Sequence, residues 1–257
     1  MGKVWCSGFP IVEMARRDMP KPLTVIYPYY QNARFLARQL DHWLTLRLSS
    51  DVASMLKVIV VDDGSPDRAA QEVLRGRGLD FMRLFRLHDD IRWNWLAARN
   101  IGFHHADSGW CLVTDMDHMI PEQTLRSVLY SEHDPNAIYG FRRFDVKDGD
   151  SPVEIAPHPN SWLMTRGMFW KVGGYDETLS GHYGTDGDWR RRMAKVAPIE
   201  ILTDALHRYE YVDDSSTTHY LRKQPQDAKV RHIVSARGKG WRPKTLSFPY
   251  NEVNLCP

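Results

Sequence analysis

The sequence contains few cysteines, and their spacing suggests neither a disulfide framework nor a zinc site. Three are present, Cys6, Cys111 and Cys256, and no two of them form a C-x-x-C pair. Cys111 lies in an apolar run and is expected to be a buried thiol. The cysteines therefore favour a protein that works under reducing conditions.

A long hydrophobic segment is also missing. No run of about 18 apolar residues occurs and the mean hydropathy is −0.48, which argues against a transmembrane helix. The apolar stretch at residues 4–12 is short and is broken by Gly8 and Pro10, unlike the core of a secretory signal. We therefore expect a soluble protein made in the cytoplasm, with one large α/β domain.

The net charge is only +2, but the basic residues are unevenly distributed. Residues 219–244 contain eight lysines and arginines and a single acid, Asp227. Such a segment suits phosphate groups on a nucleotide, a lipid or a nucleic acid. A solvated basic surface explains the same run equally well.

Apolar, β-rich runs alternate with helical patterns over the first 130 residues. The runs that predict buried strands are 23–27, 57–61, 81–87 and 110–114. Helices are expected to begin at Asn32, Ser65, Asn94 and Pro121. Shorter strands at 137–141 and 161–165 and a helix at 186–194 are expected to follow. This order predicts a doubly wound, mixed but mostly parallel sheet flanked by helices.

Acidic residues stand beside the ends of the predicted elements. They are Asp62 and Asp63 after the second strand, Asp115 and Asp117 after the fourth, and Asp186 and Asp188 at a later helix. In open α/β sheets, ligands bind at the carboxyl ends of the strands. One such pair alone would be interpreted as a helix cap, but three sets at one edge favour a functional site.

A group transfer in which a diphosphate is the leaving group is a reaction that needs carboxylates of this kind. The leaving diphosphate carries negative charge, which a hard divalent cation with carboxylate and water ligands can neutralise. In an Asp-x-Asp pair, one carboxylate can meet ribose hydroxyls while the other meets the metal. A hydroxyl acceptor also needs a general base within hydrogen-bonding reach.

Short motifs along the chain resemble, in order and spacing, those of family 2 glycosyltransferases of the GT-A fold. They are 27–32 (YPYYQN), 60–65 (VVDDGS), 97–102 (AARNIG), 115–117 (DMD), 173–177 (GGYDE) and 185–189 (TDGDW). The similarity covers about residues 22–195. It implies an enzyme, a hexosyl- or pentosyltransferase, that uses a nucleotide-sugar donor.

The resemblance also implies a domain organisation. Residues 1–21 would form an N-terminal arm, and 22–203 the GT-A domain. Within it, 22–120 would bind the nucleotide-sugar, and 121–203 would carry the acceptor site and the catalytic group. Residues 204–257 would form a basic C-terminal extension that closes over the donor site.

The resemblance assigns residues to the donor site. Those implied to contact the donor are Pro28, Tyr29 or Tyr30 and Asp62 at the base, Arg99 and Asn100 at the phosphates or sugar, and Asp115 at the ribose or sugar. Asp117 would ligate Mn²⁺ or Mg²⁺. Asp186 would be the general base of an inverting enzyme. Asp188 would support the loop or contact the acceptor.

Histidines and the basic tail complete the expected site. His118 follows the metal aspartate and could touch the metal, or lie behind it, or face solvent. A C-terminal histidine could be a further ligand, and we prefer His219 to His207, which lies in a strand-like alternation at 205–211. Arg222 and Lys223 follow His219 and could close over the diphosphate.

The acceptor is less well defined than the donor. By resemblance the donor is a UDP-sugar, although GDP and dTDP donors remain open. Trp162 and Trp189 could stack on an acceptor sugar, although a buried aromatic is the commoner fate of tryptophan. The acceptor would be a glycan or, given the arginines at 190–192 and the basic tail, a hydroxylated base in DNA.

Two other functions remain open. A nucleotidyltransferase can use a similar sheet and aspartate pair, but would normally carry a glycine-rich, basic phosphate loop after its first strand. A non-catalytic protein could keep the fold and bind a nucleotide-sugar or a glycan. The presence of both Asp117 and Asp186 argues against the second alternative.

Overall fold

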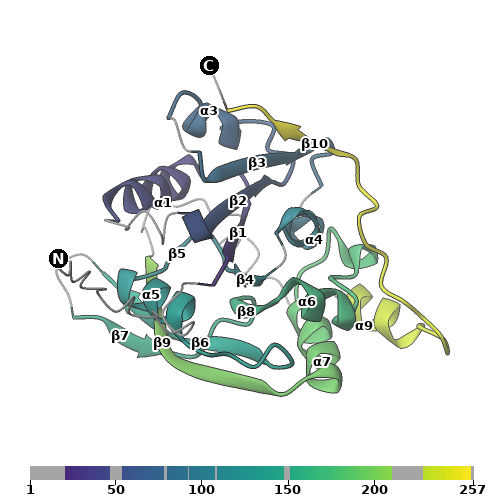
Figure 1. Cartoon of the computed structure of the whole chain (residues 1–257). Helices are drawn as coiled ribbons and strands as arrows, with labels where there is room; N and C mark the ends of the chain where they lie inside the picture. The colour runs from purple at the N-terminus through teal and green to yellow at the C-terminus, as the bar shows by residue number, and fades with distance from the viewer. Residues whose placement is uncertain are drawn as a thin grey trace, which may run out of the picture.

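The computed structural model describes residues 21–46, 54–77, 80–91, 93–107, 109–147, 151–209 and 228–255. Within them lies a ten-stranded mixed sheet flanked by helices (Figure 1). Its parallel part has the order β3-β2-β1-β4, formed by β1 (Leu23–Tyr29), β2 (Leu56–Asp62), β3 (Met82–Leu87) and β4 (Trp110–Val113). All four strands were predicted from the sequence.

Further strands extend the sheet beyond β4. They are β8 (Trp162–Thr165), β6 (Ile138–Val146), β9 (Ile199–Tyr209) and β5 (His118–Met119), with β7 (Val153–Ile155) paired to β6. At the opposite edge, β10 (Tyr250–Val253) pairs antiparallel with β3. Because β8 runs antiparallel to β4, the residues that precede β8 lie beside the carboxyl end of β4.

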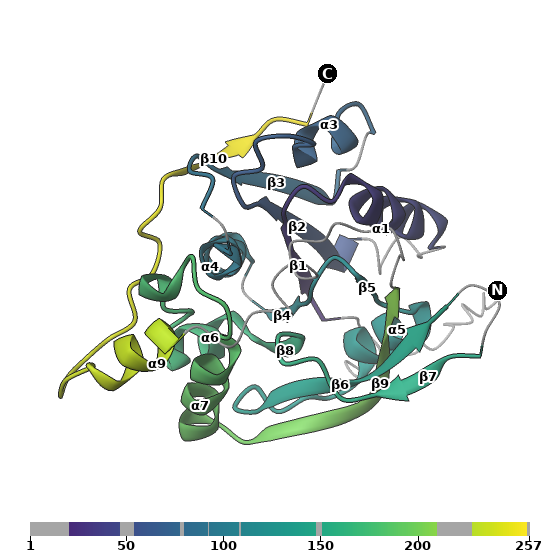
Figure 2. The same cartoon turned by 180° about the vertical axis from the view of Figure 1, so that it is seen from behind.

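Helices cover both faces of the sheet (Figure 2). One face carries α1 (Ala33–Thr45), α3 (Ala70–Leu74) and α5 (Glu122–Tyr130); the other carries α4 (Trp95–His105), α6 (Arg166–Val172), the 3-10 turn η2 (Glu177–Leu179), α7 (Asp186–Val196) and α9 (Ala228–Ser235). None of the described helices has both the length and the apolar character needed to cross a membrane.

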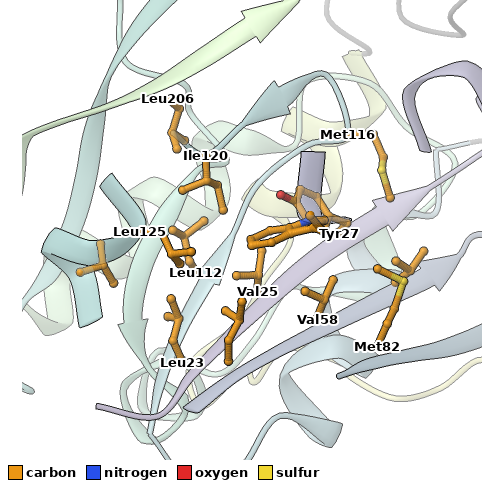
Figure 3. Packing of buried hydrophobic residues seen from close by; sticks show 14 of the residues in the cluster. Leu23, Val25, Tyr27, Val58, Met82, Leu112, Met116, Ile120, Leu125 and Leu206 are labelled. Atoms are coloured by element: carbon orange, nitrogen blue, oxygen red, sulfur yellow. The ribbon is translucent and has the colours of Figure 1, made fainter. Parts of the chain in front are cut away.

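The alternation of side chains along β1 divides the core in two. Leu23, Val25 and Tyr27 point to the face of α1 and α5, whereas Ile26 points to the face of α4. Figure 3 shows the first of these cores, where side chains of β1 and β2 pack beside those of β4 and α5. Burial of both faces explains why these strands appear in the sequence as continuous apolar runs.

The predicted helix starts are correct in position, with one exception. The Asn32 side chain accepts a hydrogen bond from the Phe35 amide at 3.2 Å and caps α1. The helix expected from Ser65 is wrong, because α3 begins only at Ala70. The Asp62 carboxylate accepts hydrogen bonds from the amides of both Ser65 and Ala70, which holds the intervening residues as a loop.

The expected division between domain and extension at residue 203 falls inside β9, which continues to Tyr209. The described residues of the expected extension are integrated into the domain. The Lys244 backbone oxygen accepts from the Glu177 amide at the start of η2, and its amide donates to the Asp176 side chain. At the other edge, β10 completes the sheet beside β3.

Candidate active site

The parallel register of β1, β2 and β4 brings their carboxyl ends to one edge of the sheet. The predicted aspartates follow there: Asp62 ends β2, and Asp115 and Asp117 come directly after β4. Asp186, the first residue of α7, is close enough to interact electrostatically with Arg99 and Asp115. The fold therefore gathers side chains from β4, α4 and α7 into one candidate site.

Arg99 is a deeply buried charged group at this edge. Its side chain is 1% exposed, forms an ion pair with Asp115, and lies 4.2 Å from the ring centre of Trp95. Nε and Nη1 of Arg99 have no hydrogen-bond partner among the described residues. Leaving such donors unpaired is costly, and they match the oxygens of a phosphate or a sugar. Burial raises the pKa of Asp115, and the charge of Arg99 opposes that rise.

Asp117 and His118 form a second pair. Asp117 Oδ1 lies 2.6 Å from His118 Nδ1, and the carboxylate is about one-third exposed whereas the imidazole is fully buried. Burial acts to raise the pKa of Asp117, but the charge and hydrogen bond of His118 outweigh it and hold the pKa well below its usual range. Asp117 therefore offers an ionised carboxylate at the surface of the site, and His118 lies behind it.

His158 belongs to the same group, although its position in the sequence gave no sign of it. Its Nε2 lies 3.4 Å from Asp115 Oδ2, and its ring centre is 4.5 Å from that of His118. Burial lowers the pKa of His158 well below the usual value, so the ring is neutral near pH 7. The signal that could have found it is the segment 158–161, with polar His158, Asn160 and Ser161, directly before β8, which the antiparallel pairing brings to the end of β4.

Asn160, in the same run, holds the predicted base. Its Nδ2 donates a hydrogen bond to Asp186 Oδ1 at 2.6 Å. Burial raises the pKa of Asp186, while this hydrogen bond and the charge of Arg99 oppose the rise. A carboxylate with a raised pKa accepts a proton more readily than an ordinary one.

The predicted base pocket needs correction at Tyr29 and Asp62. Tyr29 is 1% exposed, and its hydroxyl donates to the backbone oxygen of Arg68. Asp62 is fully buried and its two oxygens hold the loop to α3. Tyr30 and Pro28 are only half-buried, and Tyr30 donates to Asp90 Oδ1 at 2.8 Å. Of the predicted residues at the end of β1, Pro28 and Tyr30 are thus the accessible ones.

Asn100 also has a structural role in place of the predicted donor contact. Its Nδ2 donates to the Tyr175 backbone oxygen and to Glu177 Oε1, each at 2.8 Å, and its Oδ1 accepts from the Tyr175 amide. The buried amide is thus fully used in joining α4 to the loop before η2.

The predicted acceptor residues are all buried. Trp162 is 4% exposed and donates to the Pro159 backbone oxygen at 2.9 Å. Trp189 is 1% exposed and stacks on Tyr175 with ring centres 4.4 Å apart. Asp188 forms ion pairs with Arg192 and Arg237. The burial of the two tryptophans and the ion pairs of Asp188 fit the alternatives that the sequence left open, a core aromatic and a residue that supports the loop.

Of the predicted C-terminal residues, only His207 lies in the described part of the chain. His219, Arg222 and Lys223 lie outside the described residues. His207 lies in β9, opposite Met119 of β5, with its ring 6.3 Å from that of Phe144. Burial lowers the pKa of His207, in keeping with the structural role that its strand position suggested.

The carboxylates of the candidate site suit a metal ion that takes its other ligands from substrate and water. No group of three His, Cys, Asp or Glu side chains among the described residues is arranged to hold a metal ion. Asp117 nevertheless presents a partly exposed, ionised carboxylate, the kind of oxygen ligand that Mn²⁺ and Mg²⁺ prefer. Mg²⁺ in particular is often bound by one or two carboxylates together with substrate phosphates and water.

Comparison with solved structures shows the same fold in glycosyltransferases. A Staphylococcus aureus TarS 1–349 structure in complex with UDP-GlcNAc has a TM-score of 0.60 and 16% identity; the match covers 77% of this chain and 61% of that one. A mannosyltransferase from Pyrobaculum calidifontis, PcManGT, in complex with GDP-Man and Mn²⁺, has a TM-score of 0.59 and 16% identity, over 87% of this chain and 66% of that one. GalNAc-T7 with UDP, GalNAc and Mn²⁺ has a TM-score of 0.57 and 13% identity, over 76% and 45%.

These likenesses show a GT-A fold, and the chain spans only about 61% of the TarS fragment. No curated protein matches in sequence. Residues 24–185, more than half of the chain, match the family described as Glycosyl transferase family 2. This chain belongs to glycosyl transferase family 2.

Proposed function

We propose that this chain transfers a sugar from a nucleotide-diphosphate donor, a UDP-sugar, to an acceptor hydroxyl with inversion at the anomeric carbon. The observation that carries the proposal is the arrangement of Asp186, which Asn160 holds within the electrostatic reach of Arg99 and Asp115. Family membership favours sugar transfer over nucleotidyl transfer. Complexes of the similar folds with UDP-GlcNAc, GDP-Man and UDP support a nucleotide-sugar donor.

The donor site in this proposal lies between β1 and α4. The nucleobase rests against Pro28 and Tyr30, the accessible residues at the end of β1. Asp115 accepts hydrogen bonds from ribose or sugar hydroxyls, and Arg99 donates from its unpaired nitrogens to the phosphates or sugar. Arg99 is pre-organised for this role because its packing against Trp95 fixes the guanidinium plane.

Asp117 is the proposed protein ligand of Mn²⁺ or Mg²⁺. When bound, the cation neutralises the charge that develops on the leaving diphosphate. His118 donates to Asp117 Oδ1 and so orients the carboxylate. The Mn²⁺ in the PcManGT and GalNAc-T7 complexes supports the choice of a divalent cation.

Asp186 is the proposed general base. It removes the proton of the acceptor hydroxyl as that oxygen attacks the anomeric carbon, and the bond from this carbon to the diphosphate oxygen breaks. Attack from the side opposite the leaving group inverts the anomeric centre. The raised pKa of Asp186 suits it to take up this proton.

The acceptor is proposed to be a glycan hydroxyl. A hydroxylated base in DNA is the second candidate, because Arg190 and Arg191 are exposed on α7 within two turns of Asp186. Arg192 faces inward and is excluded from such a role. Transfer to DNA would weaken steeply with added salt, whereas transfer to a neutral glycan would not.

A panel of nucleotide-sugars with Mn²⁺, monitored for slow hydrolysis without acceptor, tests the proposed donor. Hydrolysis of one donor identifies the reaction class and the sugar together. Absence of both hydrolysis and thermal stabilisation with every UDP-, GDP- and dTDP-sugar would contradict the proposal and favour a non-catalytic protein.

Asp117→Ala tests the metal. We expect Mn²⁺ to strengthen donor binding to the unaltered protein and to have little effect on this variant, because the carboxylate ligand is lost. Calorimetric titration with and without Mn²⁺ measures the difference, and Asp67→Ala, at an exposed aspartate, is the matched control. Equal Mn²⁺ dependence in both variants would show that Asp117 does not hold the metal.

A further inference from the structure

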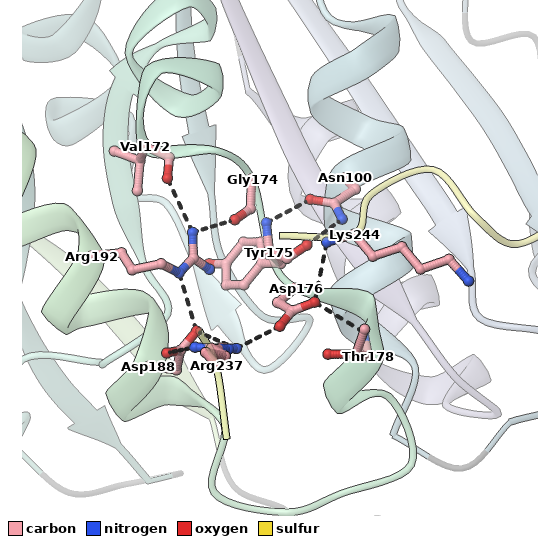
Figure 4. A network of polar contacts seen from close by, with 10 residues as sticks. All are labelled: Asn100, Val172, Gly174, Tyr175, Asp176, Thr178, Asp188, Arg192, Arg237 and Lys244. Carbon is pink, nitrogen blue, oxygen red and sulfur yellow. Dashed lines mark hydrogen bonds and ion pairs between the residues drawn. The ribbon is translucent and has the colours of Figure 1, made fainter. Parts of the chain in front are cut away.

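The segment 237–247 lies against α7 and the loop 173–177, and its Arg237 contacts both α7 and the loop (Figure 4). Arg237 Nη1 donates to Asp188 Oδ1 and Nη2 donates to Asp176 Oδ2, both at 2.5 Å. Its side chain is 11% exposed, and the guanidinium carbon lies 3.7 Å from the ring centre of Trp241. A single arginine from outside the region that matches the family therefore links two elements inside or adjoining it.

The first of these contacts holds the start of α7. Asp188 is in the first turn, two residues after Asp186, and its amide donates to the Thr185 oxygen at 3.1 Å. Arg192, one turn later, donates to Asp188 Oδ2 at 3.1 Å and to the Gly174 oxygen at 2.6 Å. The side chain of Asp188 is thus held on both oxygens, which fixes the turn that carries Asp186.

The second contact leads to α4. Asp176 also accepts from the Lys244 amide at 3.2 Å, and the neighbouring Glu177 accepts from Leu246 and Ser247 amides at 2.8 and 2.7 Å. Glu177 in turn accepts from Asn100 of α4. Segment 237–247 therefore connects the helix of Asp186 to the helix that carries Arg99.

We propose that Arg237 is a positioning residue, which sets Asp186 relative to Arg99 and Asp115 by joining the first turn of α7 to the loop bound to α4. The proposal rests on the proposed function, in which Asp186 is the general base. Arg237 itself touches neither donor nor acceptor. Its loss shifts the base while the donor site at the ends of β1 and β4 stays in place.

Arg237→Met and Arg237→Lys test this role. The first keeps the bulk of the side chain without its donors, and the second keeps the charge but cannot reproduce the fork that meets two carboxylates. We expect kcat of transfer to fall roughly 10- to 100-fold for Arg237→Met, since small misplacements of a catalytic group have effects of this size. The kcat of Arg237→Lys should lie between that of Arg237→Met and that of the unaltered protein. In both variants the KM for the donor should stay within about twofold of its unaltered value.

Glu252→Gln is the matched control. It removes an ion pair with Arg83 at β10, in the same C-terminal region but away from α7. It should leave kcat and KM unchanged. If kcat falls equally in this control, the effect of Arg237 is general destabilisation and the proposal is wrong.

The outcomes separate this proposal from the one on which it rests. If Asp186→Asn abolishes transfer but folded Arg237→Lys and Arg237→Met keep kcat within twofold, Arg237 does not position the base. A donor KM that rises in parallel with the loss of kcat would likewise overturn the proposal. If Asp186→Asn itself transfers normally, the assignment of the base fails first. Should Arg237→Met not fold, Arg237→Lys alone decides between these results.

Discussion

At the scale of single residues, the site depends on a buried arginine whose charge is only partly satisfied inside the protein. Arg99 pairs with Asp115 through Nη2, yet Nε and Nη1 have no partner among the described residues. Elsewhere at this edge, Asn100 and Asp62 use their hydrogen-bonding groups on the protein itself. The contrast separates Arg99, whose unpaired donors can bind a ligand, from Asn100 and Asp62, whose polar groups hold loops in place.

Arg99→Lys should weaken donor binding while leaving the fold intact. Lysine keeps the charge beside Asp115 but loses the planar donors, and hydrogen bonds to charged groups contribute about 1.5–3 kcal/mol, so affinity should fall roughly 10- to 100-fold. Calorimetric titration with the donor measures the change. Arg142→Met, which breaks an exposed ion pair with Glu154, is the control. Unchanged affinity in Arg99→Lys would remove Arg99 from the donor site.

The pH dependence of kcat should reflect the environment of Asp186. The base acts only when ionised, and burial raises its pKa above the ordinary 3.8, so activity should decline on the acid side at a higher pH than an ordinary aspartate would give. The Asn160 hydrogen bond lowers the same pKa, and therefore Asn160→Ala should move the acid limb to still higher pH. A pH profile of kcat for both proteins measures this. A shift to lower pH in Asn160→Ala would contradict the account.

At the scale of elements, periodicity in the sequence predicted the strands and most helices, because each buries a regular set of apolar side chains. The departures occur where side-chain chemistry replaces periodicity. Leu44 continues the four-residue spacing of the buried Leu36 and Leu40 but is 52% exposed, since α1 buries Trp43 instead. The helix expected at Ser65 starts late because the Asp62 carboxylate binds two amides of the loop, a use of a side chain that apolar periodicity does not report.

Contact between α4 and β1 gives a test of packing at this scale. A Cβ on Gly102 would lie 2.3 Å from Ile26 Cγ2, so Gly102→Ala should lower the free energy of unfolding by roughly 1–2 kcal/mol, the overpacking cost outweighing the gain in helix propensity. Gly167, in α6, has no atom closer than 3.9 Å to an added Cβ. Gly167→Ala should therefore stabilise by up to about 1 kcal/mol. Urea unfolding measures the free energy of unfolding of both variants. If Gly102→Ala is stabilising, the close approach of α4 to β1 is contradicted.

At the scale of the whole molecule, the candidate site draws on strand ends, a crossover loop and a later helix. The aspartates could be predicted because they directly follow predicted strands. His158 and Asn160 could not, since only the antiparallel return of β8 brings them beside Asp115 and Asp186. The burial of Trp162 and Trp189 could not be predicted for a related reason: the sequence marks them as aromatic, but only the fold places both, one on β8 and one on α7, in the same core.

The central claim is that Asp186 is the base of a sugar transfer from a nucleotide donor. The most direct test compares Asp186→Asn with the unaltered protein in donor binding and in transfer, under identical Mn²⁺ concentrations. Donor affinity should stay within about twofold, because the donor contacts lie on other residues. Transfer should fall by roughly 10²- to 10⁴-fold, the usual contribution of general-base catalysis. Transfer by Asp186→Asn at the normal rate would contradict the account.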